Sequence, residues 1–190
     1  MKVFFTASQK GKDKYESYYI QIFNLLKKKG FTHVDSEIIS QNSAEFYKNL
    51  EEKGSKGNVE LYEKNINNIK TADINVFECS FNSLSVGFMV EKSLELNKPT
   101  IVLFVSKQKP FFLEGIQDEK LITGSYDLDT LDSVLSEVMD KAANLRDKRF
   151  NFFISPSLLE YLELASKQEG ITKSTFIRNL LINHKRKIRK

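Results

Sequence analysis

The sequence predicts an α/β domain with a mostly parallel sheet, followed by a small C-terminal β-α-α module. Three observations favour this fold class. Five short apolar segments alternate with helix-prone segments over the first 145 residues, which is typical of parallel strands joined by helical crossovers. From residue 146 onward the chain carries eleven Lys/Arg against four Asp/Glu. A separate strand–helix–helix pattern begins there, so we expect two domains, residues 1–145 and 146–190.

Hydrophobic periodicity and turn signals place the elements of the first domain. We expect strands at Lys2–Thr6, Thr32–Ile39, Ile74–Cys79, Thr100–Val105 and Leu121–Tyr126. We expect helices at Asp13–Lys29, at 43–70 in two pieces broken by Gly54 and Gly57, at Val86–Leu96 and at Leu128–Asn144. The run Thr100–Val105 is apolar throughout, as in a strand that is covered on both faces.

Composition excludes several classes of protein. No apolar run approaches the length that spans a bilayer, and the N-terminus lacks the layout of a secretory signal. We therefore expect a cytoplasmic protein without a membrane partner. The single cysteine, Cys79, is expected to be a small buried hydrophobe, and His33 and His184 lie too far apart to suggest a metal site. We expect neither a metal nor a cofactor.

The C-terminal segment reads as one strand and two capped helices. In residues 148–154, Phe150, Phe152 and Ile154 alternate with Arg149, Asn151 and Phe153. Ser155 and Pro156 are suited to begin a helix that ends at Gly170. Thr172 then caps a second helix. A unit of about forty residues buries too little surface to be stable alone, and its single strand lacks a partner. Pairing with the same strand of a second copy meets both needs.

This strand–cap–helix–Gly-Ile-Thr-Lys-Ser–helix layout resembles the ribbon-helix-helix family over residues 148 to about 184. The resemblance implies a homodimer, or a higher even oligomer, that binds double-stranded DNA. Arg149, Asn151 and Phe153 would enter the major groove, where Arg suits guanine and Asn suits adenine. Phe153 would touch thymine methyls or weaken sequence preference. Lys173 and Ser174 would hold the DNA phosphates. A dimerisation module without DNA binding, and a solubilising tail, are the alternatives.

Two polar segments follow predicted strands of the first domain. Ligands of parallel sheets bind beyond the carboxyl ends of the strands, and Thr6–Lys10 and Ser80–Gly87 occupy that position. Both are rich in hydroxyl, amide or basic side chains. Gly87 would let backbone N–H groups approach an anion near the start of a helix. These segments indicate a small polar or phosphorylated ligand.

The central segment from Asp73 to Glu91, together with Asn97–Phe104 and the opening Val3–Ser8, resembles the nucleoside 2-deoxyribosyltransferase family. Within it, the resemblance points to the branch of deoxynucleoside monophosphate N-hydrolases and covers about residues 1–145. It implies a flavodoxin-like fold, with a parallel sheet flanked by helices. It also implies cleavage of the bond between base and deoxyribose through a covalent glycosyl–carboxylate intermediate.

The residues that would perform this chemistry are replaced. The family's nucleophilic Glu corresponds to Met89, which cannot form the ester, and the orienting Asp corresponds to Asn65. The tyrosine of the first strand is Phe4, and the arginine of the next loop is Lys10. Positions that hold sugar hydroxyls or a 5′-phosphate in the family are retained as Ser8, Lys10, Ser83 and Gly87.

Three explanations are open for the first domain. It binds a nucleotide without turning it over, or Glu78 or Glu91 replaces the nucleophile in a shifted site, or the pocket has closed and the domain only packs into an oligomer. Glu91 lies about 200° around a helix from Met89 and should point elsewhere. Glu78, at the end of a strand, is expected to support the loop by hydrogen bonding.

We therefore expect a dimeric DNA-binding protein, a transcriptional regulator whose catalytically degenerate domain binds a nucleotide. No catalytic residue is assigned. The alternative is a nucleoside or deoxynucleoside monophosphate N-glycosidase, or deoxyribosyltransferase, with a DNA-tethering or dimerising tail. The expected ligand site consists of Ser8, Lys10, Asn65, Ser83, Gly87 and Met89.

Overall fold

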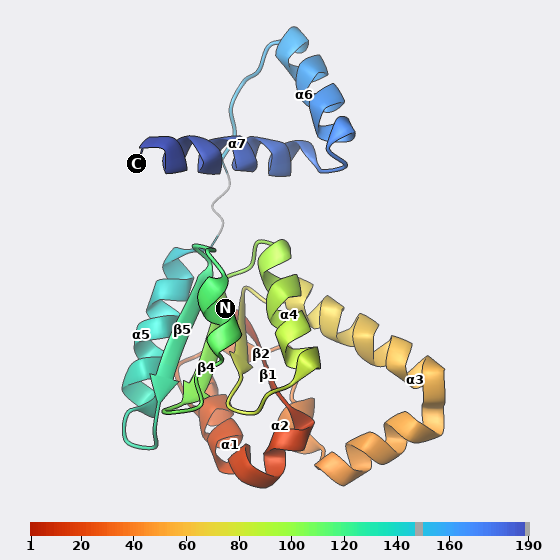
Figure 1. Ribbon diagram of the computed structural model, residues 1–190, viewed down its shortest axis with the longest axis vertical. Coiled ribbons are helices and arrows are strands. Elements are labelled where there is room, and N and C mark those ends of the chain that lie inside the picture. Colours follow the sequence, from red (N-terminus) through yellow and green to blue (C-terminus); the bar gives the residue numbers. More distant parts are fainter. Residues whose placement is uncertain (147–149, 189–190) are drawn as a thin grey trace. The chain divides into compact units, whose positions relative to one another are not determined.

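The chain folds into two separate units. The computed structural model describes residues 1–146 and 150–188, and the chain divides into Met1–Asp147 and Lys148–Lys190. This division falls two residues after the boundary expected from the charge distribution. The larger unit contains the sheet, and the smaller one contains the blue helices α6 and α7 in Figure 1.

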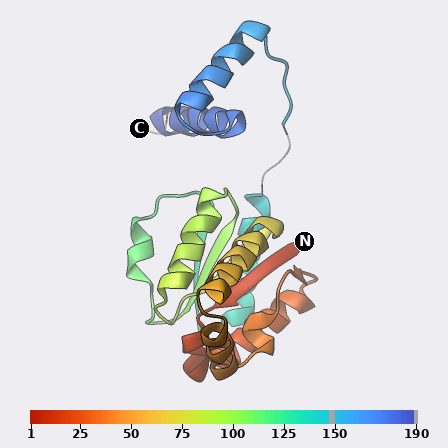
Figure 2. The ribbon, with the colours of Figure 1, turned by 90° about the vertical axis from the view of Figure 1, so that its right-hand side faces the viewer.

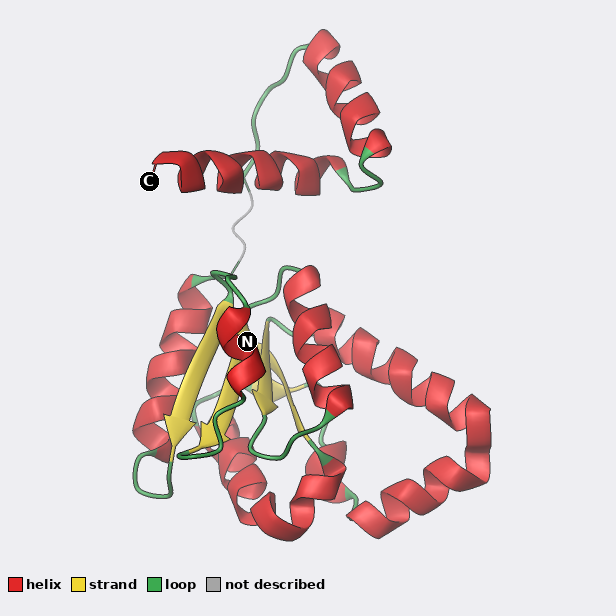
Figure 3. Cartoon of the chain, viewed as in Figure 1, coloured by secondary structure: helices red, strands yellow, loops and turns green. Residues whose placement is uncertain are grey.

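The larger unit is built on a five-stranded sheet in which every neighbouring pair is parallel. Its order β2-β1-β3-β4-β5 is the flavodoxin-like arrangement, which confirms the expected fold class. Helices flank the yellow strands in Figure 3. The strands are β1 (Lys2–Ala7), β2 (Thr32–His33), β3 (Ile74–Glu78), β4 (Thr100–Val105) and β5 (Leu121–Tyr126).

Helices connect these strands. The helices of the larger unit are the short 3-10 segments η1 (Gln9–Gly11) and η2 (Phe111–Gly115), and α1 (Lys12–Lys28), α2 (Glu37–Ser40), α3 (Ser43–Thr71), α4 (Leu84–Glu95) and α5 (Leu131–Asn144). Figure 2 shows α3 and α4 running across the same side of the sheet. Among the described residues, no helix combines the length and the apolar character that a membrane crossing requires.

The sheet separates two apolar cores because successive side chains of a strand point to opposite faces. Val3 and Phe5 of β1 pack into the core that includes residues of α1 and α5. Phe4, between them, packs into the core that includes Ile69 of α3 and Val90 of α4. Both faces of the central strands are therefore buried, as the continuous apolar runs predict.

The second expected strand is only partly present, so that prediction is wrong. Strand β2 ends at His33, and α2 begins at Glu37, where the expectation extended the strand to Ile39. The Asp35 side chain accepts a hydrogen bond from the Glu37 backbone N–H at 2.6 Å. Such Asp-centred turns end strands, and this one turns the chain at the edge of the sheet.

Two helix starts also differ from the expectation. Helix α4 begins at Leu84 rather than Val86, because the hydroxyl of Ser83 caps it by accepting the Val86 N–H at 3.4 Å. Helix α5 begins at Leu131 rather than Leu128. There the Asp127 carboxylate accepts the Thr130 N–H at 3.0 Å, which holds residues 127–130 in a turn.

Helix α3 has one kink. Gly54 lies at φ 55° and ψ −139°, outside the helical region, whereas Gly57 lies within the helix. The expected break is therefore confirmed at Gly54 and wrong at Gly57. The kink turns the two halves of α3 into the arch that Figure 1 shows in orange and yellow, and both halves contribute to the site described below.

The smaller unit consists of α6 (Pro156–Gln168) and α7 (Lys173–Ile188). Ser155 caps α6 by accepting the Leu158 N–H, and Gly170 ends it at φ +67°. The expected strand over 148–154 is absent from its described part, residues 150–154. A lone strand has no partner for its N–H and C=O groups, so a single chain does not form one.

Candidate functional site

A cavity of about 160 Å³ lies beyond the carboxyl ends of β1 and β3. The end of β1, the β2–α2 turn, both halves of α3 and the start of α4 form its walls. The lining residues are Phe4, Phe5, Thr6, Ala7, Ser8, Gln9, Asp35, Glu37, Ile38, Phe46, Tyr47, Leu50, Leu61, Asn65, Ser83, Ser85, Val86 and Met89. This is the edge at which parallel α/β sheets bind ligands.

One side of the cavity is suited to an anion. Ser8 follows β1 and is buried, while Ser83 and Ser85 lie at the start of α4. The first N–H groups of a helix lack partners within the helix and carry partial positive charge. Hydroxyl donors together with such N–H groups form a site for a phosphate.

Four of the six expected ligand residues line the cavity. These are Ser8, Asn65, Ser83 and Met89. Lys10 does not line it, but its ammonium lies 5.9 Å from the ring centroid of Tyr47, which does. Gly87 is exposed and outside the lining, and its N–H donates to the Ser83 carbonyl at 3.0 Å. The N–H of Gly87 itself is therefore engaged within the helix, and the expectation that Gly87 lets backbone N–H groups approach an anion stays a prediction.

Neither carboxylate considered as a substitute nucleophile reaches the cavity lining. Glu91 is exposed on α4, and Glu78 is completely buried. Glu78 accepts hydrogen bonds from the backbone N–H and hydroxyl of Ser80 and from the Tyr126 hydroxyl, the last at 3.0 Å. Burial raises the pKa of Glu78 despite these hydrogen bonds. The expectation that Glu78 supports the loop is confirmed.

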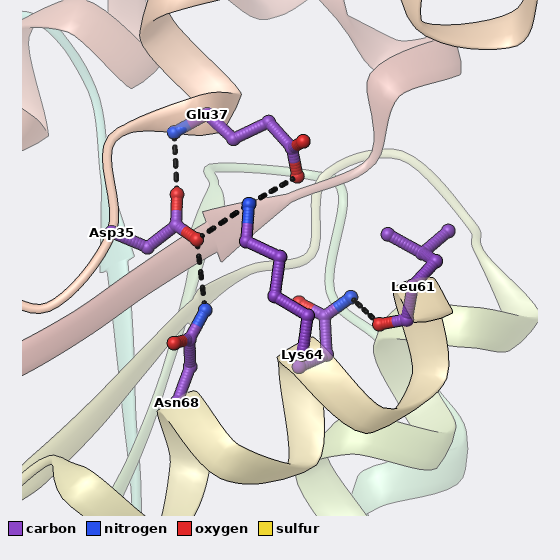
Figure 4. Close-up of polar contacts among 6 residues, drawn as sticks. Asp35, Glu37, Leu61, Lys64 and Asn68 are labelled. Atoms are coloured by element: carbon purple, nitrogen blue, oxygen red, sulfur yellow. Dashed lines mark hydrogen bonds and ion pairs between the residues drawn. The ribbon is translucent and has the colours of Figure 1, made fainter. Parts of the chain in front are cut away.

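Instead, the lining contains two carboxylates that the sequence reasoning missed, Asp35 and Glu37 (Figure 4). Lys64 of α3 lies 2.9 Å from Asp35 Oδ2 and 3.1 Å from Glu37 Oε2. Asn68 donates to the same Asp35 oxygen at 2.8 Å. An Asp-Ser-Glu sequence inside a predicted strand was the available signal, since such residues disfavour strands.

The cluster fixes the charge state of Asp35. Burial alone raises the pKa of Asp35, but hydrogen bonds from the Glu37 N–H, Lys64 and Asn68 outweigh it and bring the pKa below its usual value. Burial likewise lowers the pKa of Lys64, and the two carboxylates more than compensate, so the pKa of Lys64 is raised. The cavity therefore has a charged wall at the β2–α2 turn.

Two amide side chains complete the lining. Asn65 donates from Nδ2 to the Leu61 carbonyl of its own helix at 2.9 Å. Gln9 is 9% exposed, and its Oε1 is buried without a hydrogen bond from any described residue. A buried acceptor of this kind is costly unless a ligand or water supplies a donor. The described residues hold no group of three His, Cys, Asp or Glu that could bind a metal.

In the smaller unit, the residues expected to contact DNA lie before α6 and at the start of α7. Arg149 lies outside the described residues. Asn151 and Phe153 are exposed, Phe153 completely. Ser174 is exposed, and Lys173 forms an exposed ion pair with Glu163 at 2.6 Å. Such pairs contribute about 0–1 kcal/mol, so a phosphate competes readily for Lys173.

Two known proteins are similar to this chain. No family model matches the chain. A protein of Syntrophotalea carbinolica named "Putative 2′-deoxynucleoside 5′-phosphate N-hydrolase 1" is 30% identical over 128 residues, which cover 67% of this chain and 85% of the relative. The solved structure of a CMP N-glycosidase from Clostridium botulinum superimposes with a TM-score of 0.51 at 14% identity, covering 74% of this chain and 98% of that one. The second likeness shows the fold alone.

The fold and the sequence relative together define a domain of the nucleoside 2-deoxyribosyltransferase type. The chain belongs to the 2′-deoxynucleoside 5′-phosphate N-hydrolase family.

Proposed function

We propose that the α/β unit binds a 2′-deoxynucleoside 5′-monophosphate in the cavity beyond β1 and β3. The observation that carries this proposal is the composition of the cavity. The hydroxyl of Ser8 after β1 and those of Ser83 and Ser85 at the start of α4 suit a phosphate. Phe46 and Tyr47 offer aromatic surface for a base. The name of the relative supports this ligand class.

Calorimetric titration with deoxynucleoside monophosphates and with the free deoxynucleosides tests the proposal. We expect the monophosphates to bind more tightly, because only they place a phosphate at the start of α4. Ser85→Ala should weaken monophosphate binding, whereas Ser133→Ala, on α5 outside the lining, should leave it unchanged. Equal affinity for nucleosides and monophosphates would remove the basis for the phosphate site.

Hydrolysis of the ligand is the second candidate function. The name of the relative favours it, and the lining holds the carboxylates Asp35 and Glu37 although Met89 stands at the family's nucleophile position. Glycosidic cleavage breaks the bond from C1′ to the base nitrogen, and water supplies the hydroxyl on C1′ and the proton on the base. The two candidates share one ligand and differ only in turnover.

Chromatography of free base after incubation with each monophosphate separates these candidates. Release by the wild type that is lost in Glu37→Gln or Asp35→Asn would establish an N-hydrolase with relocated carboxylates. Glu91→Gln serves as the control, because Glu91 is exposed and outside the lining. Binding without release would establish a nucleotide-binding domain that has lost the family's chemistry.

We also propose that the smaller unit pairs with a second copy and binds double-stranded DNA, so that the protein acts as a transcriptional regulator. The support is the agreement of α6, α7 and their caps with the sequence pattern, and the net charge of +7 after residue 145. Large apolar side chains of this unit are exposed in the single chain: Phe150, Phe152, Phe153, Leu158, Leu159, Tyr161, Leu164, Leu180, Leu181 and Ile188.

Selection of genomic fragments by the full-length protein over a range of salt concentrations tests DNA binding. We expect a repeated or palindromic site whose affinity falls as salt rises, because phosphate contacts release counterions. Asn151→Ala should change the selected sequence. If no fragment is retained at low salt, the unit is a dimerisation module and the regulatory proposal fails.

A further inference from the structure

The cavity is electrostatically asymmetric, and the order of the strands is the reason. Strands β2 and β3 lie on opposite sides of β1. The turn after β2 carries Asp35 and Glu37, and the loop after β3 leads to Ser83 and Ser85. Two strand spacings separate these segments by roughly 10 Å. One end of the cavity is therefore acidic, and the other offers hydroxyl and N–H donors.

This asymmetry orients a nucleotide. A phosphate carries negative charge and is repelled by the net negative charge that Asp35, Glu37 and Lys64 carry together. It is attracted by the donors at the start of α4. The base then lies toward the β2–α2 turn, against Phe46 and Tyr47 of the first half of α3.

Glu37 is the carboxylate that remains available at this end. Both oxygens of Asp35 are engaged, Oδ1 by the Glu37 N–H and Oδ2 by Lys64 and Asn68. Glu37 Oε2 pairs with Lys64, and the described residues offer its Oε1 no hydrogen bond. The Glu37 side chain is 33% exposed, against 12% for Asp35.

We propose that Glu37 selects the base of the ligand by accepting a hydrogen bond from an exocyclic amino group. Cytosine, adenine and guanine then bind in preference to thymine and uracil. An ionised carboxylate only accepts hydrogen bonds, and the pyrimidine bases without an amino group turn carbonyl oxygens toward it on both sides of their single N–H. This assignment rests on the proposed nucleotide-binding function.

Lys64 and Gln9 also favour a base that donates hydrogen bonds. The ion pair with Lys64 holds the Glu37 carboxylate in place, so little side-chain entropy remains to be lost on binding. The unsatisfied Oε1 of Gln9 is a second acceptor in the lining. Glu37 Oε1 and Gln9 Oε1 are therefore acceptors without a hydrogen-bond donor among the described residues, and the ligand has to supply the donors.

The matched ligands dCMP and dUMP test the proposal, because they differ at the base in an amino group against a carbonyl at C4 and in the hydrogen that N3 carries in uracil alone. We expect the wild type to bind dCMP at least about tenfold more tightly, since leaving the carboxylate unpaired against a carbonyl is costly. In Glu37→Gln the ratio should fall to within about threefold, because an amide both donates and accepts. The pair dAMP and dIMP repeats the comparison for purines.

Thermal melting verifies that Glu37→Gln is folded, which is expected because Lys64 keeps its pair with Asp35. Glu91→Gln should retain the wild-type preference. If both ligands bind equally to the wild type, or if Glu37→Gln keeps the preference, the assignment of Glu37 is overturned while nucleotide binding stands. If neither ligand binds the wild type, the proposed function itself fails.

Discussion

At the residue scale, burial raises the pKa of the Glu78 carboxyl group, which has a structural role. It lies under the loop between β3 and α4, where Ser80 and Tyr126 donate to one of its oxygens. Its other oxygen and the Tyr19 hydroxyl are both buried without a hydrogen-bond partner among the described residues. A carboxyl group in this position is better tolerated protonated than charged.

We predict that Glu78→Gln becomes more stable than the wild type as the pH rises. The folded-state pKa of Glu78 is raised, so its contribution is fully present below the unfolded pKa near 4.5 and is lost as pH rises toward the folded pKa. Glutamine does not ionise, so the variant should gain about 1–3 kcal/mol over the wild type above that window. Urea unfolding from pH 4 to 8 measures this. A stability difference that does not change with pH would contradict the assignment.

The pKa of Asp35 is shifted in the opposite direction to that of Glu78, so its contribution to stability changes with pH in the opposite sense. Its folded-state pKa is lowered, so its stabilising contribution is present above the unfolded pKa near 3.8 and is lost as pH falls through the folded pKa. We predict that Asp35→Asn costs about 1–3 kcal/mol at pH 7, because Lys64 and the Glu37 N–H lose a charged acceptor. The cost should shrink in acid. Glu114→Gln, at an exposed surface ion pair, is the control and should show a much smaller loss.

At the scale of elements, the kink in α3 shapes the cavity. The first half of α3 carries Phe46, Tyr47 and Leu50, and the second half carries Leu61 and Asn65, all of them lining residues. A straight helix of this length would carry these two groups far apart, since each residue advances it by about 1.5 Å. The kink at Gly54, between the two groups, therefore allows both of them to line the cavity.

We predict that Gly54→Ala destabilises the protein by about 1–3 kcal/mol, because an alanine is strained at φ 55° and ψ −139°. Open space surrounds the added methyl group, so the loss reports the backbone alone. Nucleotide affinity should fall with it, since the first half of α3 is displaced. Gly87→Ala is the matched control. It lies in helix α4, also in open space, and should be neutral or gain up to about 1 kcal/mol. Equal losses in both variants would argue against strain at Gly54.

At the scale of the whole molecule, the proposed dimer would complete the smaller unit. Its described residues bury only Leu162 and Ser166, which is too little for independent stability. Pairing residues 150–154 with the same segment of another chain would form the proposed two-stranded ribbon and cover their aromatic side chains.

We predict that Phe152→Asp raises the dissociation constant of the dimer at least about tenfold, because a charge cannot be buried under the ribbon without a partner. Sedimentation velocity over a range of concentrations measures this, and DNA retention should fall in parallel. Phe112→Asp is the control, since Phe112 is also an exposed phenylalanine but lies in the α/β unit. If both variants keep the wild-type oligomer, the smaller unit is not a dimerisation module.

Local sequence was sufficient for most of the elements. Strands β4 and β5 occur at the expected residues, and the caps at Ser155 and Thr172 lie where the pattern put them. Periodicity and capping act over a few residues, so one segment carries the whole signal. The prediction that Ser8, Asn65, Ser83 and Met89 belong to one site also rested on local sequence, because the resemblance to the family is a match of residues along the chain.

Tertiary structure decided what lies far apart in the sequence. Asp35 and Glu37 meet Lys64 only because parallel pairing places the turn after β2 beside α3, and no pattern within the segment 32–39 shows that contact. The sequence by itself determined the sheet, the helices and the hydroxyl end of the cavity. The fold alone decided its acidic end, the burial of Glu78 and the non-strand conformation of residues 150–154, because each depends on contacts that are distant along the chain.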